Sequence, residues 1–273
     1  MNMALFNKVC IVGVGLIGGS LGMAIKKRRL AKLVIGVVRR KKTIEQAFEK
    51  KALDVATLDL KEGVKGADLV ILCGPVSVIE GQLKTLSRIL DPKAIVIDVG
   101  STKLNIEQAA KKYLKKNPFV GCHPMAGSEK TGIENAQADL FNGSFCFLTS
   151  SHPKIVKFWQ MLGVKTIVTD ARRHDLWVAT ASQLPHLLSF AFLNSFTSVR
   201  FPMNPSLKEF ARLAMSDAQL WADIFLSNRA TILSSLHVFG LELSKWSKAL
   251  KRTDRARISS LIKTANRKAS HVS

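Results

Sequence analysis

Short apolar segments alternate with amphipathic ones through the first 150 residues, and this alternation restricts the possible folds more than any other feature. Amphipathic stretches such as 76–90 and 102–116 separate five apolar runs with the length of buried strands: 8–13, 33–38, 68–73, 94–99 and 144–149. Strands that alternate with helices form βαβ units, in which helices cover both faces of a parallel sheet. The sequence therefore predicts an α/β fold with an open sheet. A further strand-like run at 165–168 ends this part of the chain.

The pattern changes near residue 170, where strand-like runs give way to helical periodicity. We therefore expect two domains, 1–169 and 170–273. Apolar residues spaced alternately by four and three positions form one seam along a predicted long helix: Ile232, Leu236, Phe239, Leu243, Trp246 and Leu250. Such a seam packs either inside the chain or against a second subunit, and we expect a homodimer. Pro202 and Pro205 divide the helical region into at least two parts.

The segment 13–18 reads GVGLIG and lies between an apolar run and a predicted helix. In this context GxGxxG spacing predicts dinucleotide binding. Gly13 permits the tight turn, Gly15 lets a pyrophosphate approach the backbone, and Gly18 allows close packing of helix and strand. With Leu16 and Ile17 between them, these residues form the predicted cofactor-binding turn.

The end of the second predicted strand indicates which dinucleotide binds. NAD sites usually carry an acidic residue there, which holds the ribose 2′-hydroxyl. This chain reads GVVRRKK at 36–42 and has no acid in that stretch. Because arginine pairs with a 2′-phosphate and a carboxylate repels it, Arg39 and Arg40 predict NADP rather than NAD.

Two more loops follow predicted strands, CGP at 73–75 and DVGSTK at 98–103. Ligands of such sheets bind outside the carboxyl ends of the strands. We therefore expect Cys73, Gly74 and Pro75 to contact the cofactor, and Ser101 to face both cofactor and substrate. Ser101 also lies where its hydroxyl could cap the N-terminus of a helix that begins near Thr102.

A predicted loop at 121–129, GCHPMAGSE, holds His123, which could be a catalyst, a metal ligand or an ordinary loop residue. Candidate companions in the helical half are Asp175, His186 in SQLPH, and Arg212 and Trp221 in FARLAMSDAQLWADIF. No HxxxH pair or carboxylate cluster accompanies the histidines, so no metal site is predicted.

Taken together, GxGxxG, DVGSTK, GCHPMAGSE, SQLPH and RLAMSD…LWADIF resemble the prephenate/arogenate dehydrogenase family of tyrosine biosynthesis, in order over residues 7 to 250. The resemblance implies a Rossmann-type dinucleotide-binding domain followed by an all-helical dimerisation domain. The family transfers hydride from a cyclohexadienol ring to nicotinamide while the ring carboxylate leaves as CO₂. Prephenate yields 4-hydroxyphenylpyruvate, and arogenate yields tyrosine.

The resemblance also implies roles for individual residues. His123 matches the general base that takes the proton of the ring hydroxyl. Ser101 matches the serine that orients this histidine and bonds the same hydroxyl. Arg212 matches the arginine that binds a substrate carboxylate, and His186 a second histidine of the substrate site. Positions that match further substrate-site residues are Ser128, Glu129, Asp175, Ser182 and Trp221, with Asp175 expected in a gating ion pair.

Two features bear on the substrate and point in different directions. The missing acid after the second strand resembles NADP-dependent members, which often prefer arogenate. Glu129 follows the prephenate-type form of the HPMAG(S/T)E motif. We expect prephenate as the substrate, with arogenate as the alternative. No fused mutase or regulatory domain is expected, so any feedback by tyrosine would act at the active site.

Composition sets the remaining expectations. The formal net charge is +21, and 26–42 alone holds nine basic residues and no acidic one. Such a surplus steers anionic ligands into a cleft, but it also suits a polyanion. With no nucleic-acid motif and a single Tyr, we do not expect a nucleic-acid partner. Four Cys without a CxxC pair fit a reducing compartment, and Val9–Ile25 has too many glycines for a membrane span, so we expect a cytoplasmic protein.

Two rival functions stay open on sequence alone. A β-hydroxyacid dehydrogenase would need a catalytic lysine in a GxxxK-like context, whereas 170–200 holds QLPHLLS instead. A non-catalytic NADP-binding sensor that docks nucleic acid through its basic faces would show no turnover and salt-sensitive binding.

Overall fold

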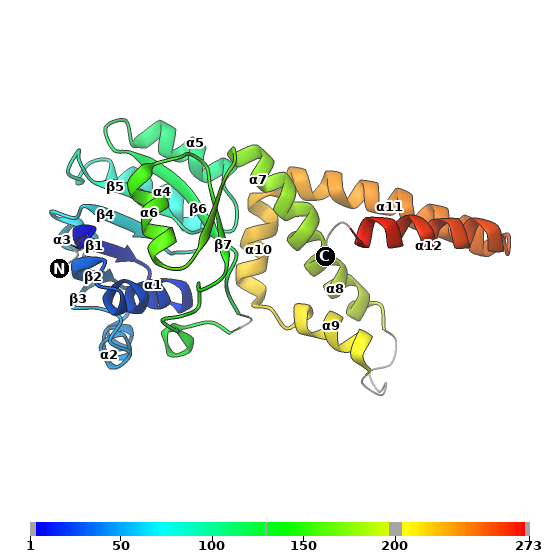
Figure 1. Ribbon diagram of the computed structural model, residues 1–273, viewed down its shortest axis with the longest axis horizontal. Coiled ribbons are helices and arrows are strands. Elements are labelled where there is room, and N and C mark those ends of the chain that lie inside the picture. The colour runs from blue at the N-terminus through cyan, green and yellow to red at the C-terminus, as the bar shows by residue number, and fades with distance from the viewer. Residues whose placement is uncertain (1–3, 129, 197–203, 271–273) are drawn as a thin grey trace. The chain divides into compact units, whose positions relative to one another are not determined.

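A computed structural model describes residues 4–128, 130–196 and 204–270 (Figure 1). Glu129 and Pro202, both named above, lie outside these residues. The chain divides into two compact units, Met1–Asn228 and Arg229–Ser273, and each is described by itself. The change from strands to helices comes near residue 170, inside the first unit.

Eight strands form one sheet in the order β3-β2-β1-β4-β5-β6-β7-β8. Neighbouring strands run parallel except for the antiparallel pair β6–β7. Their bounds are β1 (Phe6–Val12), β2 (Ala31–Val37), β3 (Val55–Thr57), β4 (Leu69–Leu72), β5 (Ile95–Asp98), β6 (Phe119–Pro124), β7 (Phe145–Leu148) and β8 (Lys165–Val168). Six of them match predicted runs to within two residues, while β3 and β6 lie where no strand is predicted.

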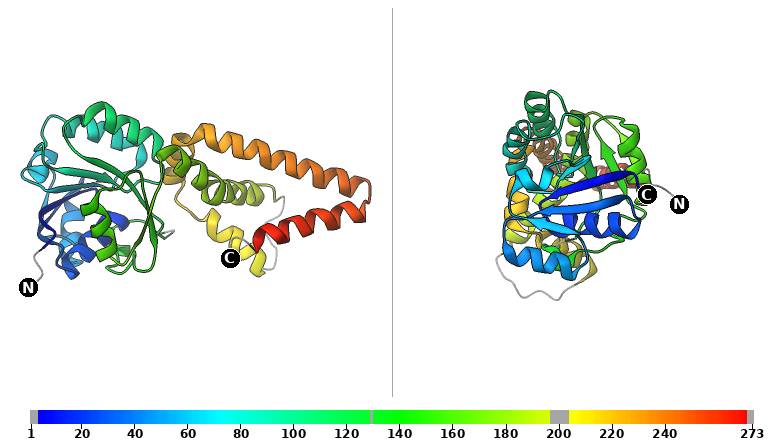
Figure 2. Two further views of the ribbon diagram at one scale, coloured as in Figure 1. Left: turned by 45° about the horizontal axis from the view of Figure 1, so that its top comes forward. Right: turned by 90° about the vertical axis from the view of Figure 1, so that its left-hand side faces the viewer.

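Successive residues of the central strands face two separate cores. Val9 and Ile11 of β1 belong to one hydrophobic cluster, whereas Cys10 and Val12 belong to the other. The first cluster includes residues of α1 (Leu16–Lys27) and α6 (Pro153–Met161), and the second those of α4 (Val76–Leu86) and α5 (Leu104–Tyr113). Helices therefore cover both faces of the sheet, as predicted (Figure 2).

Shorter elements complete the nucleotide-binding half: α2 (Lys41–Glu49), α3 (Leu60–Val64) and the 3₁₀ turn η1 (Ile133–Asn135). The helical part of the first unit comprises α7 (Ala171–Val178), the π-helix η2 (Ala179–Gln183), α8 (Leu184–Asn194), α9 (Pro205–Ala214) and α10 (Ala218–Ser227). The continuous helical stretch 171–194 is long and apolar enough to cross a membrane by length and composition alone. One such helix is weak evidence, because the core helix of a soluble protein passes the same test.

The second unit is a helical hairpin of α11 (Arg229–Lys251) and α12 (Arg255–Ala269). The apolar seam predicted from the sequence lies on α11. Leu243 and Leu250 of this seam are 53% and 61% exposed, so the described residues of this chain do not bury it completely. Ile232, at the start of the seam, is buried, whereas the exposed later residues fit the second of the two predicted environments, a partner subunit.

Gly18 provides a test of the packing of β1 against α1. A Cβ at Gly18 would lie 2.0 Å from the carbonyl oxygen of Gly13, a backbone atom that cannot move away cheaply. We expect Gly18→Ala to lower the free energy of unfolding by about 1–3 kcal/mol. The matched control is Gly81→Ala in α4, where a Cβ meets no atom within 4 Å. It should leave stability unchanged or raise it by up to about 1 kcal/mol. Urea denaturation of both variants measures the difference, and equal effects would contradict the close approach.

Candidate active site

The glycine turn between β1 and α1 has the shape of an anion cradle. Gly13 adopts φ +96° and lies against the backbone of Cys73 and Gly74, where a Cβ would be only 3.1 Å away. A Cβ on Gly15 would meet no atom within 4 Å, so the space in front of this residue is open. Among the described residues no side chain caps α1, and its first turn holds no acid. The turn therefore fits the pyrophosphate of a dinucleotide.

Basic side chains surround the end of β2. Val38 is buried, whereas Arg39 and Arg40 are exposed, and none of the described carboxylates forms an ion pair with either of them. Arg40 precedes α2, which begins with Lys41 and has neither a side-chain cap nor an acidic residue in its first turn. Cations at the positive end of a helix repel its dipole unless an anion is bound there.

His123 lies on β6, so the predicted loop at 121–129 is wrong for residues 121–124. Two local features explain the strand. Gly121 is small enough to pass the side chains of Thr149 and Lys103, which would lie within 3.0 Å of a Cβ. Pro124 is the last residue of β6, and the next hydrogen bond to β7 comes from the backbone N–H of Met125 to the carbonyl of Phe145, so the missing N–H of Pro124 is not needed there. His123 pairs with Phe147 of β7, and its side chain is half-buried.

A chain of hydrogen bonds joins His123 to helix α7. Its Nδ1 lies 2.9 Å from Nε2 of His174, and Nδ1 of His174 lies 2.8 Å from Oδ1 of Asp175. His174 is 0% exposed and Asp175 2% exposed. Asp175 is thus nearly buried, and its observed side-chain partner is His174 rather than a lysine or arginine. His174 was not predicted as a site residue. The only sequence signal for it is its place beside Asp175 on the buried face of an amphipathic helix.

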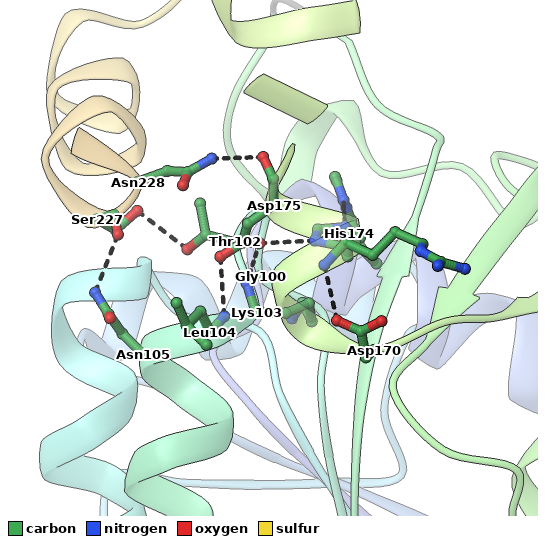
Figure 3. Close-up of polar contacts among 12 residues, drawn as sticks. Gly100, Thr102, Lys103, Leu104, Asn105, Asp170, His174, Asp175, Ser227 and Asn228 are labelled. Carbon is green, nitrogen blue, oxygen red and sulfur yellow. Dashed lines mark hydrogen bonds and ion pairs between the residues drawn. The ribbon is translucent and has the colours of Figure 1, made fainter. Parts of the chain in front are cut away.

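The carboxylate of Asp175 also holds the beginning of α5. It accepts hydrogen bonds from the backbone N–H groups of Lys103 and Leu104, at 2.7 and 2.9 Å (Figure 3). Helix α5 begins at Leu104 rather than near Thr102, and the capping acceptor comes from α7. The capping role considered for Ser101 is therefore wrong, because a carboxylate from another element occupies that position. Ser101 itself is half-buried.

A buried ion pair lies beneath the same loop. Lys103 Nζ bonds to Asp98 at the end of β5, and both side chains are almost fully buried. Burial raises the pKa of Asp98, an effect that Lys103 opposes. Burial, His174 and Lys103, in that order, lower the pKa of His123 well below its usual value of 6.5. His123 is consequently a neutral imidazole near pH 7, which is the form that accepts a proton.

A second group of predicted residues lies on α8, α9 and α10. The ring of His186 stacks on Trp221, with centroids 3.7 Å apart and planes inclined by 21°. His186 Nδ1 bonds to the carbonyl oxygen of Ser182 at 2.9 Å. Partial burial and nearby Arg212 lower the pKa of His186, although the Ser182 carbonyl opposes them. Arg212 is exposed on α9 and lies 3.2 Å from Glu209.

Helix α10 connects this group to the nucleotide-binding half (Figure 3). Ser227 contacts Thr102 through its hydroxyl at 3.0 Å, and its carbonyl accepts a bond from Asn105. Asn228 donates to the carbonyl of Asp175 and to the side chain of Gln183, both at 2.8 Å. These bonds were not predicted. They pair residues more than 40 positions apart, so no local pattern marks them.

The loop after β6 carries Ser128, which is exposed and accepts a bond from the backbone of Lys130. Ser128 and Leu16 of the glycine turn line one cavity of about 270 Å³, together with Lys50 and Lys130. Glu129 lies outside the described residues, so its predicted role stays a prediction.

Comparisons with known proteins agree with these features. The nucleotide-binding domain of prephenate dehydrogenases matches residues 21–168, and their dimerisation domain matches 170–264. A prephenate dehydrogenase of Lactococcus lactis is 30% identical over 258 residues, covering 91% of this chain and 72% of that protein. A cyclohexadienyl dehydrogenase of Zymomonas mobilis is 28% identical, covering 92% and 91%.

Solved structures of prephenate and arogenate dehydrogenases are similar to this chain over nearly its whole length. Prephenate dehydrogenase from A. aeolicus, in complex with hydroxyphenyl propionate and NAD⁺, has a TM-score of 0.89 at 28% identity and covers 98% of both chains. Arogenate dehydrogenase of Synechocystis has a TM-score of 0.83 at 27% identity, covering 97% and 100%. With both domain models matched in order and the sheet, turn and helices in place, the chain belongs to the prephenate dehydrogenase family.

Proposed function

We propose that this chain is an NADP-preferring prephenate dehydrogenase, which converts prephenate to 4-hydroxyphenylpyruvate and CO₂ in tyrosine biosynthesis. The main support for the proposal is the state of His123. This half-buried histidine is kept neutral by its surroundings and is hydrogen-bonded through one ring nitrogen. A base of this kind suits the removal of a hydroxyl proton as hydride leaves the same carbon. Arogenate is the alternative substrate, since relatives of both kinds resemble this chain.

In the proposed reaction the chain's own residues position the ring and move the proton. A bound nicotinamide supplies the hydride acceptor. His123 takes the proton of the ring hydroxyl, and Ser101 holds the same hydroxyl. Arg212 binds a substrate carboxylate, which replaces Glu209 as the partner of its exposed guanidinium. His186, stacked on Trp221, lines the substrate site beside it.

The choice of NADP rests on the end of β2. Arg39 and Arg40 are exposed, α2 begins with further basic residues, and no acidic residue occupies this position. A 2′-phosphate would give these cations their missing counter-charge and would lie at the positive end of the α2 dipole. The A. aeolicus structure contains NAD⁺, so this preference would distinguish the present chain from that relative.

The assembly and location are part of the same proposal. We assign residues 1–169 to cofactor binding and 170–273 to substrate binding and dimerisation, in line with the two matched domains. A homodimer through the helical domain would cover the exposed seam of α11. The cytoplasm is the proposed location, and the net charge of +21 would speed the encounter with the anionic cofactor and substrate.

Steady-state turnover of prephenate and arogenate, each with NADP and with NAD, tests substrate and cofactor together. We expect the highest kcat/KM for prephenate with NADP. A higher value with NAD would overturn the cofactor assignment alone, and a higher value with arogenate would overturn the substrate assignment alone. Failure of all four combinations would refute the proposed function.

Arg39→Asp tests the 2′-phosphate contact. Loss of a charge-assisted hydrogen bond, worth about 1.5–3 kcal/mol, should raise the KM for NADP by about 10- to 100-fold and leave the KM for NAD unchanged or lower. The control is Lys32→Asp at the other end of β2, which makes the same change in net charge at an exposed position. An equal rise in both variants would point to general electrostatic steering instead.

The lowered pKa of His123 predicts the pH dependence of kcat. Because the base must be neutral, kcat should hold as the pH falls through 6.5 and decline only below that value. His123→Asn should lower kcat by about 100-fold or more, remove this decline, and leave NADP binding near normal. A decline centred above 6.5 in the unmodified enzyme would contradict the assignment of the base.

A further inference from the structure

His174 has the position of a residue that acts through another residue. Its side chain is 0% exposed, so it cannot contact a substrate. Both of its ring nitrogens are hydrogen-bonded, one to Asp175 and one to His123. The ring of Phe147, the residue opposite His123 on β7, packs edge-on against His174 with centroids 5.2 Å apart. The orientation of His174 is therefore fixed from three sides.

The direction of the hydrogen bonds follows from Asp175. Its Oδ1 accepts from the backbone N–H of Lys103 and its Oδ2 from that of Leu104, so both oxygens act as acceptors. Nδ1 of His174 must then donate its proton to Asp175. A neutral His174 consequently presents an unprotonated Nε2 to His123, and His123 must carry its own proton on Nδ1.

We propose that His174 is a positioning residue that keeps the proton of His123 on Nδ1 and leaves the lone pair of Nε2 free to act as the catalytic base. This inference rests on the proposed function of His123. The pairing of a base with a buried histidine and a carboxylate follows the rule that the partner of one ring nitrogen determines the chemistry of the other.

The arrangement links three parts of the chain. Asp175 and His174 come from α7, the N–H groups that hold Asp175 come from the start of α5, and His123 lies on β6. The loop that precedes α5 carries Ser101. One carboxylate therefore fixes both the tautomer of the base and the loop of the serine that is proposed to bind the same hydroxyl.

Within the described parts of the chain, the other titratable groups near His123 do not donate or accept at its ring. Lys103 pairs with Asp98, and Cys146 on β7 has a pKa raised well above its usual value by burial. Among these groups, His174 is the one that makes a hydrogen bond to the imidazole of His123. The tautomer can therefore be tested by changes at His174 and Asp175 alone.

Nitrogen-15 NMR of histidine-labelled full-length protein reads the tautomer without any turnover. The chain has only six histidines, so His123→Asn identifies the signals of His123. We expect its proton on Nδ1 in the unmodified protein near neutral pH. Asp175→Asn offers an amide that can donate to His174, which should reverse the chain and move the proton of His123 to Nε2. A proton on Nε2 in the unmodified protein would overturn the proposal.

Kinetics give the second readout. His174→Leu removes the acceptor and should lower kcat by about 100-fold, the lower end of what a general base contributes, with the KM for the cofactor unchanged. His174→Gln keeps an acceptor oxygen near the position of Nε2 and should recover about 10-fold of that loss. His152→Gln, at the start of α6, is the control for a histidine outside the site.

The pH profile separates positioning from a general structural defect. In His174→Leu the pH at which kcat declines should move, because His174 both accepts from the Nδ1–H of His123 and is one cause of its lowered pKa. A structural defect would scale the whole profile without moving it, and that result, or a kcat equal to that of His152→Gln, would overturn the proposal. If His174→Leu fails to fold, the NMR comparison still decides. Lack of turnover by the unmodified enzyme would refute the proposed function. The NMR spectra would still show which ring nitrogen of His123 carries the proton, because they do not depend on turnover.

Discussion

The carboxylate of Asp175 is the group on which the organisation of the site depends. A nearly buried carboxylate is costly unless its oxygens are hydrogen-bonded, and here backbone N–H groups of α5 and the ring of His174 satisfy them. The same bonds hold helix α7 against the nucleotide-binding half. Removing one partner of such a buried charge typically costs about 3–5 kcal/mol, so this contact constrains the fold as well as the chemistry.

A second buried charge, Asp98, lies at the start of the loop between β5 and α5 and pairs with Lys103 at the end of that loop. Asp98 ends β5, the strand next to β6, and its pairing with Lys103 places a cation near His123. Burial, His174 and that cation, in this order, disfavour protonation of His123. The site thus keeps a histidine neutral by its surroundings, while the hydrogen-bond chain through His174 decides which nitrogen is available. His174 contributes to both the charge state and the tautomer, because it is also one cause of the lowered pKa of His123.

Much of the fold could be predicted, because buried parallel strands are continuous apolar runs and six of the eight were recognisable. β3 has only three residues, too few for a pattern. β6 contains Gly and Pro, which local propensity assigns to loops. A strand is possible because Gly121 is small and because the next bond to β7 comes from the N–H of Met125 rather than from Pro124. The helical half was recognisable as helical, but its contacts with the sheet were not.

The sequence by itself determined the βαβ organisation, the glycine turn and the basic end of β2, since each depends on residues that are neighbours along the chain. It also indicated the family, through short motifs that occur in a fixed order. It also marked His123, Arg212 and His186 through a resemblance rather than through local chemistry. Only the tertiary structure decided that His123 lies on a strand, that Asp175 caps α5 in place of Ser101, and that a buried His174 joins the two. The physical reason is that a hydrogen bond depends on distance in space, and His123 and His174 are 51 positions apart in the chain.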